Sequence, residues 1–131
     1  MSLKILLADD SMTAQKLGQK ILTDAGHEVI AVSNGAAAVK RIAEHKPDLL
    51  LLDVFMPGNM NGLQLCKYLK ENRLTHAIPI ILLTQYNSKE STQFGLKLGA
   101  IEYIPKDAFS DAVLLETLRA KGLINEAAAE M

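Results

Sequence analysis

The sequence predicts a doubly wound α/β domain built on a parallel sheet of five strands. Four short apolar runs and a weaker fifth alternate with segments that carry helix signals. The third run is four consecutive leucines without a polar residue between them. Such a run is typical of a parallel strand covered on both faces, and the strand–helix alternation favours the α/β class.

Each apolar run marks one expected strand. The expected strands cover residues 3–8, 29–32, 49–52, 78–83 and 100–104. The fifth run is the weakest and ends at Pro105. Proline is tolerated only at strand ends or on edge strands, so this run is expected to be short and to lie at an edge.

Helices are expected between the runs, at residues 12–25, 36–45, 63–72, 89–99 and 109–121. Ser11 can cap the first helix, and Gly26 and Pro47 are expected to end the first and the second. The side chains expected to face the sheet are Leu17, Ile21, Leu22, Leu65, Cys66, Leu69, Val113, Leu114 and Leu118.

Length and composition favour a single domain. The chain has 131 residues, of which 49% are hydrophobic, enough for one core. Residues 1–123 are expected to form the domain, and residues 124–131, which are rich in Ala and Glu, a tail or the start of a linker. The formal net charge of -1 lacks the basic excess of a nucleic-acid or anionic-membrane surface, so neither is an expected partner.

The single cysteine, Cys66, excludes an internal disulfide and suits a reducing compartment. No apolar run approaches the roughly 18 residues that a membrane helix needs. Asp9 and Asp10 interrupt the first apolar stretch, which argues against a signal peptide. A cytoplasmic location is therefore expected.

Polar side chains follow the expected strands where each strand ends. Asp9 and Asp10 follow the first strand, Asp53 the third, Thr84 the fourth and Lys106 the fifth. Because the carboxyl ends of parallel strands share one edge of the sheet, these side chains are expected to converge. Open α/β sheets bind their ligands at that edge.

The chemistry of this set points to phosphoryl transfer. Clustered carboxylates repel one another and need a hard cation such as Mg²⁺, which prefers oxygen ligands. A lysine and a hydroxyl add the positive charge and the donor that stabilise a transferring phosphoryl group. One carboxylate can then act as the nucleophile and form an aspartyl-phosphate.

Several segments resemble the receiver domains of two-component response regulators. They are residues 5–11 (ILLADDS), 51–57 (LLDVFMP) followed by Gly62 and Leu63, 82–84 (LLT), and Gly99 and Ala100 with Tyr103 and Lys106. The resemblance covers roughly residues 3–121. It implies the flavodoxin-like strand order 2-1-3-4-5 of the chemotaxis receiver, with helices on both faces.

The resemblance also implies roles for single residues. Asp53 is expected to be the phosphoacceptor, with Thr84 and Lys106 binding phosphoryl oxygens. Tyr103 is expected to be the aromatic switch that turns inward when Thr84 moves, altering the face formed by the fourth helix, fifth strand and fifth helix. The phosphoryl donor would be a sensor histidine kinase or a phosphotransfer protein, and the domain would catalyse only its own phosphorylation and dephosphorylation.

The same resemblance implies a Mg²⁺ site. Asp10 is expected to bind the ion directly and Asp9 through water, with Asp53 and the backbone carbonyl of Phe55 as further ligands. Phe55 and Tyr86 are also expected to flank the approach of water to the phosphoryl group. Two aromatic side chains there predict a long-lived phosphorylated form.

Three departures from the family pattern stand near the site. Gln85 occupies a position that is usually small, and the loop after Asp53 is one residue longer, through Asn59. The usual Lys-Pro pair is replaced by Pro105 before Lys106, which excludes a cis Lys-Pro bond. None of these changes removes a reactive group.

Two other hypotheses belong to different classes. A Mg²⁺-dependent hydrolase of the haloacid-dehalogenase type would need Asp-x-Asp after the first strand, whereas Asp9 and Asp10 are adjacent. A receiver-like scaffold that is not phosphorylated would usually lack one of the reactive groups, and here all are present. Asp9 and Asp10 could also simply cap a helix.

Four other side chains are expected to have ordinary structural roles. Tyr103 is expected to be half-buried on an edge strand. His27, His45 and His76 lack metal-ligand spacing and are expected at the surface.

Overall fold

The computed structural model describes residues 2–56, 58, 60–84, 89–106 and 111–124. For residues 89–91 and 111 it describes the backbone but not the side chains. Its five strands are β1 (Lys4–Ala8), β2 (Glu28–Val32), β3 (Leu49–Asp53), β4 (Ile80–Thr84) and β5 (Glu102–Pro105). They form one sheet in the order β2-β1-β3-β4-β5, and every pair is parallel. The predicted class and strand order are confirmed.

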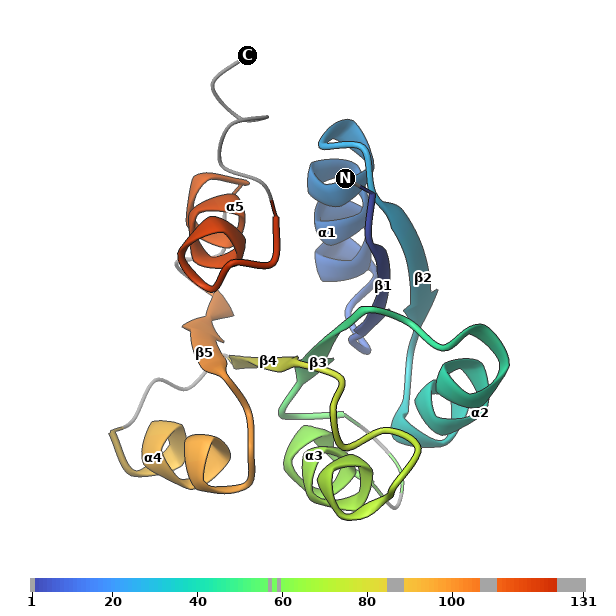
Figure 1. Cartoon of the computed structure of the whole chain (residues 1–131), viewed down its shortest axis with the longest axis vertical. Coiled ribbons are helices and arrows are strands. Elements are labelled where there is room, and N and C mark those ends of the chain that lie inside the picture. The colour runs from blue at the N-terminus through green and yellow to red at the C-terminus, as the bar shows by residue number, and fades with distance from the viewer. Residues whose placement is uncertain (1, 57, 59, 85–88, 107–110, 125–131) are drawn as a thin grey trace.

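Five helices connect the strands: α1 (Met12–Asp24), α2 (Gly35–His45), α3 (Gly62–Glu71), α4 (Lys89–Lys97) and α5 (Asp111–Ala120). Helices α1 and α5 cover one face of the sheet, and α2, α3 and α4 cover the other (Figure 1). The domain is therefore doubly wound, as predicted.

The uninterrupted apolar runs supply both cores, because successive strand side chains point to opposite faces. In β3, Leu49 and Leu51 pack with α1 and α5, whereas Leu50 and Leu52 pack with α2 and α3. All four are completely buried. This explains why the run contains no polar residue.

Polar side chains define the starts of three helices. Ser11 accepts a hydrogen bond from the first turn of α1, as predicted, and Asn34 does the same for α2. At α3 the cap is reciprocal, because Asn61 and Gln64 each accept from the backbone N–H of the other at 2.9 Å. Consequently α2 and α3 begin one residue earlier than predicted.

Two predictions of inward side chains are wrong. Leu17 is 43% exposed and Val113 is 37% exposed. In α1 the inner face passes through Gly18 and Leu22, and Leu17 lies about 100° around the helix from Gly18. In α5 the inner residues are Leu114 and Leu118, next to Val113. The apolar residues of these helices are thus more numerous than one buried stripe can hold.

The surface position expected for His27 is also wrong, whereas His45 is half-buried and His76 exposed. His27 is only 7% exposed, and its Nδ1 accepts a hydrogen bond from the backbone N–H of Leu3 at 3.0 Å. Tyr103 lies on the edge strand β5 as expected but is buried rather than half-buried, at 7% exposure.

Strand β4 begins two residues later than predicted. Ile78 belongs to the preceding turn, where its N–H donates to the carbonyl of Thr75 at 3.0 Å. Among the described residues, no helix is both long and apolar enough to cross a membrane.

Candidate functional site

The carboxyl ends of the strands bring the predicted site residues to one edge of the sheet. Asp9 directly follows β1, Asp53 is the last residue of β3, Thr84 the last of β4, and Lys106 directly follows β5. Asp53 is paired in register with Leu83, the residue before Thr84. Asp9, Asp53 and Thr84 are all buried.

Lys106 joins two of the carboxylates. Its ammonium nitrogen lies 3.1 Å from Oδ2 of Asp53 and 3.0 Å from Oδ1 of Asp9, and it donates hydrogen bonds to both. Only 15% of the lysine side chain is exposed. Ion pairs sheltered from water are screened far less than surface pairs, so this lysine holds two acidic strand ends together.

Asp9 is completely buried, and its two carboxylate oxygens differ in their contacts. Oδ1 accepts from the backbone N–H of Ser11 at 2.9 Å as well as from Lys106. Oδ2 lies 2.9 Å from the Lys106 nitrogen, but without hydrogen-bond geometry, so it is ion-paired and not hydrogen-bonded. A buried carboxylate oxygen that accepts no hydrogen bond can still bind a further cation.

Asp53 accepts a hydrogen bond at Oδ1 from the N–H of Phe55, at 3.1 Å. Burial and the negative charge of Asp9 raise the pKa of Asp53 from 3.8 to about 7, although hydrogen bonding and charge from Lys106 act in the opposite direction. Burial lowers the pKa of Lys106, but its contacts with Asp9 and Asp53 outweigh burial and raise it overall. The lysine is therefore charged at neutral pH, and Asp53 binds a proton more tightly than an ordinary carboxylate does.

The acidic residues fit a divalent cation. Asp9, Asp10 and Asp53 each offer one oxygen, and these oxygens all lie within 4.8 Å of one another. Asp10 is exposed, so the cluster opens to solvent on one side. Three oxygen donors, the unbonded Oδ2 of Asp9 and the repulsion that raises the pKa of Asp53 together suit a hard ion such as Mg²⁺.

Gly62 allows α3 to begin directly against the end of β3. A Cβ built on this residue would overlap the carbonyl oxygen of Asp53. Its N–H donates to the carbonyl of Val54 at 3.0 Å. Any side chain here would push α3 away from Asp53, which gives the glycine of the predicted motif a physical reason.

Gln15 is a site residue that the sequence analysis missed. Its side-chain nitrogen donates to the carbonyl of Asp9, to the carbonyl of Val32 at 3.1 Å and to Oγ of Ser33 at 3.1 Å. It thereby ties the end of β1, which carries the acidic pair, to the end of β2. The sequence signal that could have identified Gln15 is its helical spacing, because it lies three residues before Gly18 on the buried face of α1.

The two predicted switch residues are both inside the protein. Thr84 is completely buried at the end of β4. The ring of Tyr103 lies in the core shared with Leu82, and it packs close to Gly95 of α4. A Cβ on Gly95 would lie 3.3 Å from this ring. Tyr103 is therefore in an inward position in this structure.

Some residues named in the sequence analysis lie outside the described part of the chain: Asn59, Gln85 and Tyr86. Of the described neighbours, Phe55 is 52% exposed beside Asp53, and Pro105 ends β5 in register with Thr84. No peptide bond between described residues is cis.

This fold and this site define a receiver, and comparison with known families agrees. The model of the response regulator receiver domain matches residues 5–119. The chain therefore belongs to the response regulator receiver family of two-component systems. This assignment does not favour the hydrolase hypothesis.

Curated relatives include proteins of different length. The chain is 34% identical to protein PilH of Pseudomonas aeruginosa over 117 residues, covering 89% of this chain and 95% of PilH. It is 39% identical to the transcriptional regulatory protein CpxR of Escherichia coli over 117 residues, covering 89% of this chain but 48% of CpxR. The chain thus spans nearly all of one relative and about half of the other.

Solved structures show the same likeness. The chemotaxis response regulator CheY4 of Vibrio cholerae has a TM-score of 0.84 and 31% identity, covering 92% of this chain and 98% of CheY4. The BeF3-activated receiver domain of Klebsiella pneumoniae RstA has a TM-score of 0.81 and 35% identity, covering 89% of this chain and 96% of that domain.

Proposed function

We propose that this chain is a phosphorylatable receiver in which Asp53 accepts a phosphoryl group from a sensor histidine kinase or a phosphotransfer protein. The observation that carries the proposal is the contact of Lys106 with both Asp53 and Asp9, at 3.1 Å and 2.9 Å. A lysine held between two acidic strand ends is already in place to pair with the oxygens of a phosphoryl group attached to Asp53.

In the proposed reaction a carboxylate oxygen of Asp53 attacks the phosphorus of the donor phosphohistidine. An oxygen–phosphorus bond forms, the phosphorus–nitrogen bond breaks, and its electron pair returns to the imidazole, which takes up a proton. The attacking carboxylate must be deprotonated, and the ammonium of Lys106 favours that form. As the phosphoryl group transfers, Lys106 exchanges its contact with Asp53 for one with a phosphoryl oxygen.

Asp9, Asp10 and Asp53, with the backbone carbonyl of Phe55, would hold Mg²⁺. Bound there, the ion would offset the mutual repulsion of the carboxylates and the charge of the phosphoryl group. The unbonded Oδ2 of Asp9 supports this assignment.

Mass spectrometry of the intact protein tests the proposal. Incubation with acetyl phosphate and Mg²⁺ should add a single phosphoryl group, and Asp53→Asn should prevent it. Lys67→Met, which changes an exposed lysine on α3, is a control that should label normally. A stable, Mg²⁺-dependent adduct on Asp53→Asn at the wild-type rate would exclude Asp53 as the acceptor.

The proposed output is a shift in the face formed by α4, β5 and α5. Thr84 would move towards the phosphoryl group, and Tyr103 would respond by a change in packing against α4. Amide NMR with a beryllofluoride mimic tests this. Chemical-shift changes confined to residues near Asp53, with the resonances of Tyr103 and α4 unchanged, would contradict a coupled switch.

The extent and setting of the receiver are also part of the proposal. Residues 1–123 would form the receiver, and residues 124–131 a tail or the start of a linker. The cytoplasm is the proposed location, because phosphoryl transfer from a histidine kinase takes place there.

A further inference from the structure

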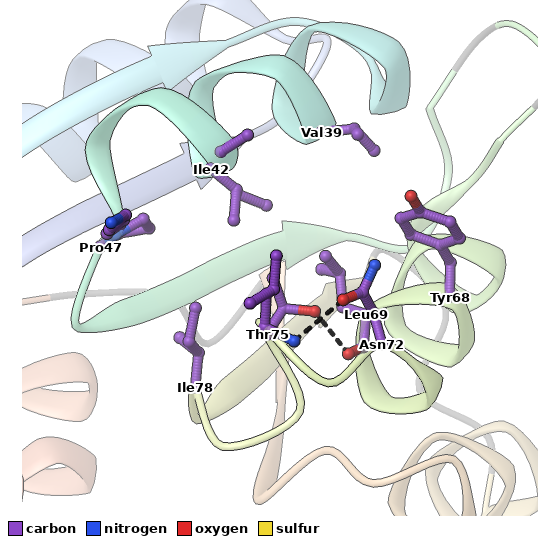
Figure 2. A pocket seen from close by; sticks show the side chains of 11 residues that line it. Val39, Ile42, Pro47, Tyr68, Leu69, Asn72, Thr75 and Ile78 are labelled. Carbon is purple, nitrogen blue, oxygen red and sulfur yellow. Dashed lines mark hydrogen bonds between the residues drawn. The ribbon is translucent and has the colours of Figure 1, made fainter.

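A pocket of about 500 Å³ lies between α2 and α3, at the end of the sheet opposite the phosphoacceptor. Pro47 and Ile78, which precede β3 and β4, line it, so it lies at the amino ends of these strands. Figure 2 shows side chains from α2 on one side and from α3 and the following loop on the other, directed towards a common space. Its volume lies within the range of small-molecule sites.

The walls of this α2–α3 pocket are mostly apolar. They include Val39, Ile42, Ala43, Pro47, Leu69 and Ile78. Leu74, which is 90% exposed, extends the apolar surface at the mouth. A ligand for this site therefore needs an apolar body.

The loop that closes the pocket is held by its own hydrogen bonds. Oγ1 of Thr75 donates to the carbonyl of Leu69 at 2.6 Å, and Nζ of Lys70 donates to the carbonyls of His76 and Ile78 at 3.0 Å and 2.8 Å. The stem of Lys70 also packs over Gly99, where a Cβ would lie 2.8 Å from the lysine Cγ. The pocket is thus formed before any ligand binds, which reduces the ordering cost of binding.

Asn72 presents a hydrogen-bond donor to this space. Its Oδ1 accepts from the backbone N–H of Leu74 at 2.9 Å, which fixes the orientation of the side-chain amide. The amide nitrogen consequently points away from that turn, and Figure 2 shows it directed towards the space beside Tyr68. A ligand group that meets it must be an acceptor.

Of the described residues that line the pocket, Lys46 alone is charged. No ion pair involves it within the described part of the chain. The carboxyl ends of α2 and α3 oppose an anion here, but the carbonyl of His45 at the end of α2 already accepts from Lys4, and that of Leu69 near the end of α3 accepts from Thr75. The charge of Lys46 is therefore available to a ligand.

We propose that the α2–α3 pocket binds a small carboxylic acid with an apolar body, such as a medium-chain or aryl-substituted acid. The hydrocarbon lies against the walls, the carboxylate accepts from the amide of Asn72, and the positive charge of Lys46 on the same pocket attracts it. The proposal does not depend on phosphorylation of Asp53, and the Asp53→Asn variant should bind the same ligand with unchanged affinity.

Two substitutions separate the polar contacts from folding. Asn72→Asp keeps the oxygen that accepts from Leu74 but replaces the donor by a second carboxylate oxygen. Lys46→Gly removes the ammonium at a position with φ of 48°, a left-handed conformation that glycine adopts more easily than lysine. Both variants are therefore expected to fold.

The experiment is an amide NMR titration of the full chain with octanoate and with the matched neutral probe octanamide. Octanoate should shift the resonances of Val39, Tyr68, Asn72 and Thr75, and it should bind wild type more tightly than octanamide does. Lys46→Gly should weaken octanoate binding about fivefold, and Asn72→Asp about tenfold while sparing octanamide. Ala43→Phe, which fills the space from an exposed position, should abolish both.

Three results would overturn the proposal. The first is equal binding of octanoate and octanamide to wild type, and the second is octanoate shifts centred on another surface. The third is a set of pocket shifts that follow protein concentration and not octanoate, which would make a second copy of the chain the occupant. Normal dispersion of the variant spectra serves as the folding control.

Discussion

The ammonium nitrogen of Lys106 lies 3.1 Å from Oδ2 of Asp53, although 53 positions separate the two residues in the chain. The contact exists because β3 and β5 end at the same edge of the sheet, on either side of β4. It offsets part of the repulsion between Asp53 and Asp9, and it makes the stability of the fold depend on the charges of the site.

Replacing Lys106 by methionine should therefore destabilise the domain. Without the ammonium, Asp9 and Asp53 become two buried carboxylates with no cation between them. The free energy of unfolding at about pH 8, measured by urea denaturation without Mg²⁺, should fall by about 2–4 kcal/mol. Lys67→Met on the surface should change the free energy of unfolding little. A similar loss in that control would show that the effect of Lys106→Met does not come from the contacts of Lys106 with Asp9 and Asp53.

Replacing Asp53 by asparagine should have the opposite effect. The pKa of Asp53 is raised from 3.8 to about 7, so the folded protein binds a proton more tightly than the unfolded chain does. The contribution of Asp53 to wild-type stability therefore declines as pH rises from about 4 to about 7. Asparagine has no such charge and should gain about 1–3 kcal/mol over wild type above about pH 7.

The measurement compares urea denaturation of wild type and Asp53→Asn at about pH 5 and about pH 8 without Mg²⁺. The difference in the free energy of unfolding between the variant and wild type should be large at the higher pH and small at the lower. Adding Mg²⁺ should stabilise wild type and reduce the difference. A difference that is the same at both pH values would show that Asp53 is already ionised throughout this range.

Phosphorylated protein should lose its phosphoryl group faster when Phe55 is replaced by asparagine. Phe55 is 52% exposed directly beside Asp53, where its ring can obstruct an approaching water. A barrier lower by about 1.4 kcal/mol would speed the loss about tenfold. Tyr68→Asn, which removes an exposed aromatic from α3, is the matched control.

Decay of the adduct, followed by mass spectrometry with no kinase present, decides between these outcomes. Equal decay of wild type and Phe55→Asn would mean that shielding by this ring does not set the lifetime. Tyr86, the second aromatic of the prediction, can be tested in the same assay as Tyr86→Glu.

Adding a methyl group at Gly95 should disturb the inward position of Tyr103. A Cβ there would lie 2.6 Å from Cδ1 of Leu82 and 3.3 Å from the tyrosine ring. Gly95→Ala should expose Tyr103 and destabilise the domain by about 1–3 kcal/mol. Iodide quenching of tyrosine fluorescence in a background of Tyr68→Phe and Tyr86→Phe reports on Tyr103 alone, since the chain has three tyrosines and no tryptophan.

The parent of that background, with Gly95 intact, gives the reference for quenching. Unchanged quenching after Gly95→Ala would show that α4 moves away and the ring stays buried, so that Gly95 does not control the position of Tyr103.

His27 should make the fold sensitive to acid. Its Nδ1 accepts from Leu3, so the ring must be neutral there, and burial, aided by the positive amino terminus, lowers its pKa from 6.5. The unfolded chain takes up a proton first as pH falls, so the stability contributed by His27 is present above 6.5 and lost below it.

The test is urea denaturation at about pH 8 and about pH 5, in the Asp53→Asn background to remove the opposite pH dependence of Asp53. His27→Phe should cost about 1–2 kcal/mol at the higher pH, because the N–H of Leu3 loses its acceptor. The variant should also lose less stability on acidification than its parent. Equal acid sensitivity would assign the effect to another group.

The regular part of this protein could be predicted because its signals are local. A strand covered on both faces must be apolar at every position, so the four leucines of β3 indicate a parallel sheet without any knowledge of neighbours. Asp53 at the end of that strand, and Asp9, Thr84 and Lys106 at the ends of others, could be assigned to one edge because parallel strands share their direction.

Other features depend on which surfaces meet. Leu17 and Val113 are apolar helix residues, as their buried neighbours are. They face outward because of the way each helix is rotated about its axis against the sheet. Gln15 and His27 are polar and became buried because backbone groups of Val32 and Leu3 lie within hydrogen-bond distance. The residues adjacent in the sequence do not indicate which distant backbone groups will be the hydrogen-bond partners.

The sequence by itself determined the class of fold, the order of elements and the set of polar side chains at the strand ends, because each follows from residue type and spacing. Only the tertiary structure decided the pairing of Lys106 with both Asp9 and Asp53, the close approach of Gly62 to Asp53, and the pocket between α2 and α3. These features arise where segments distant in the chain pack together, and their geometry depends on the relative placement of whole helices and strands.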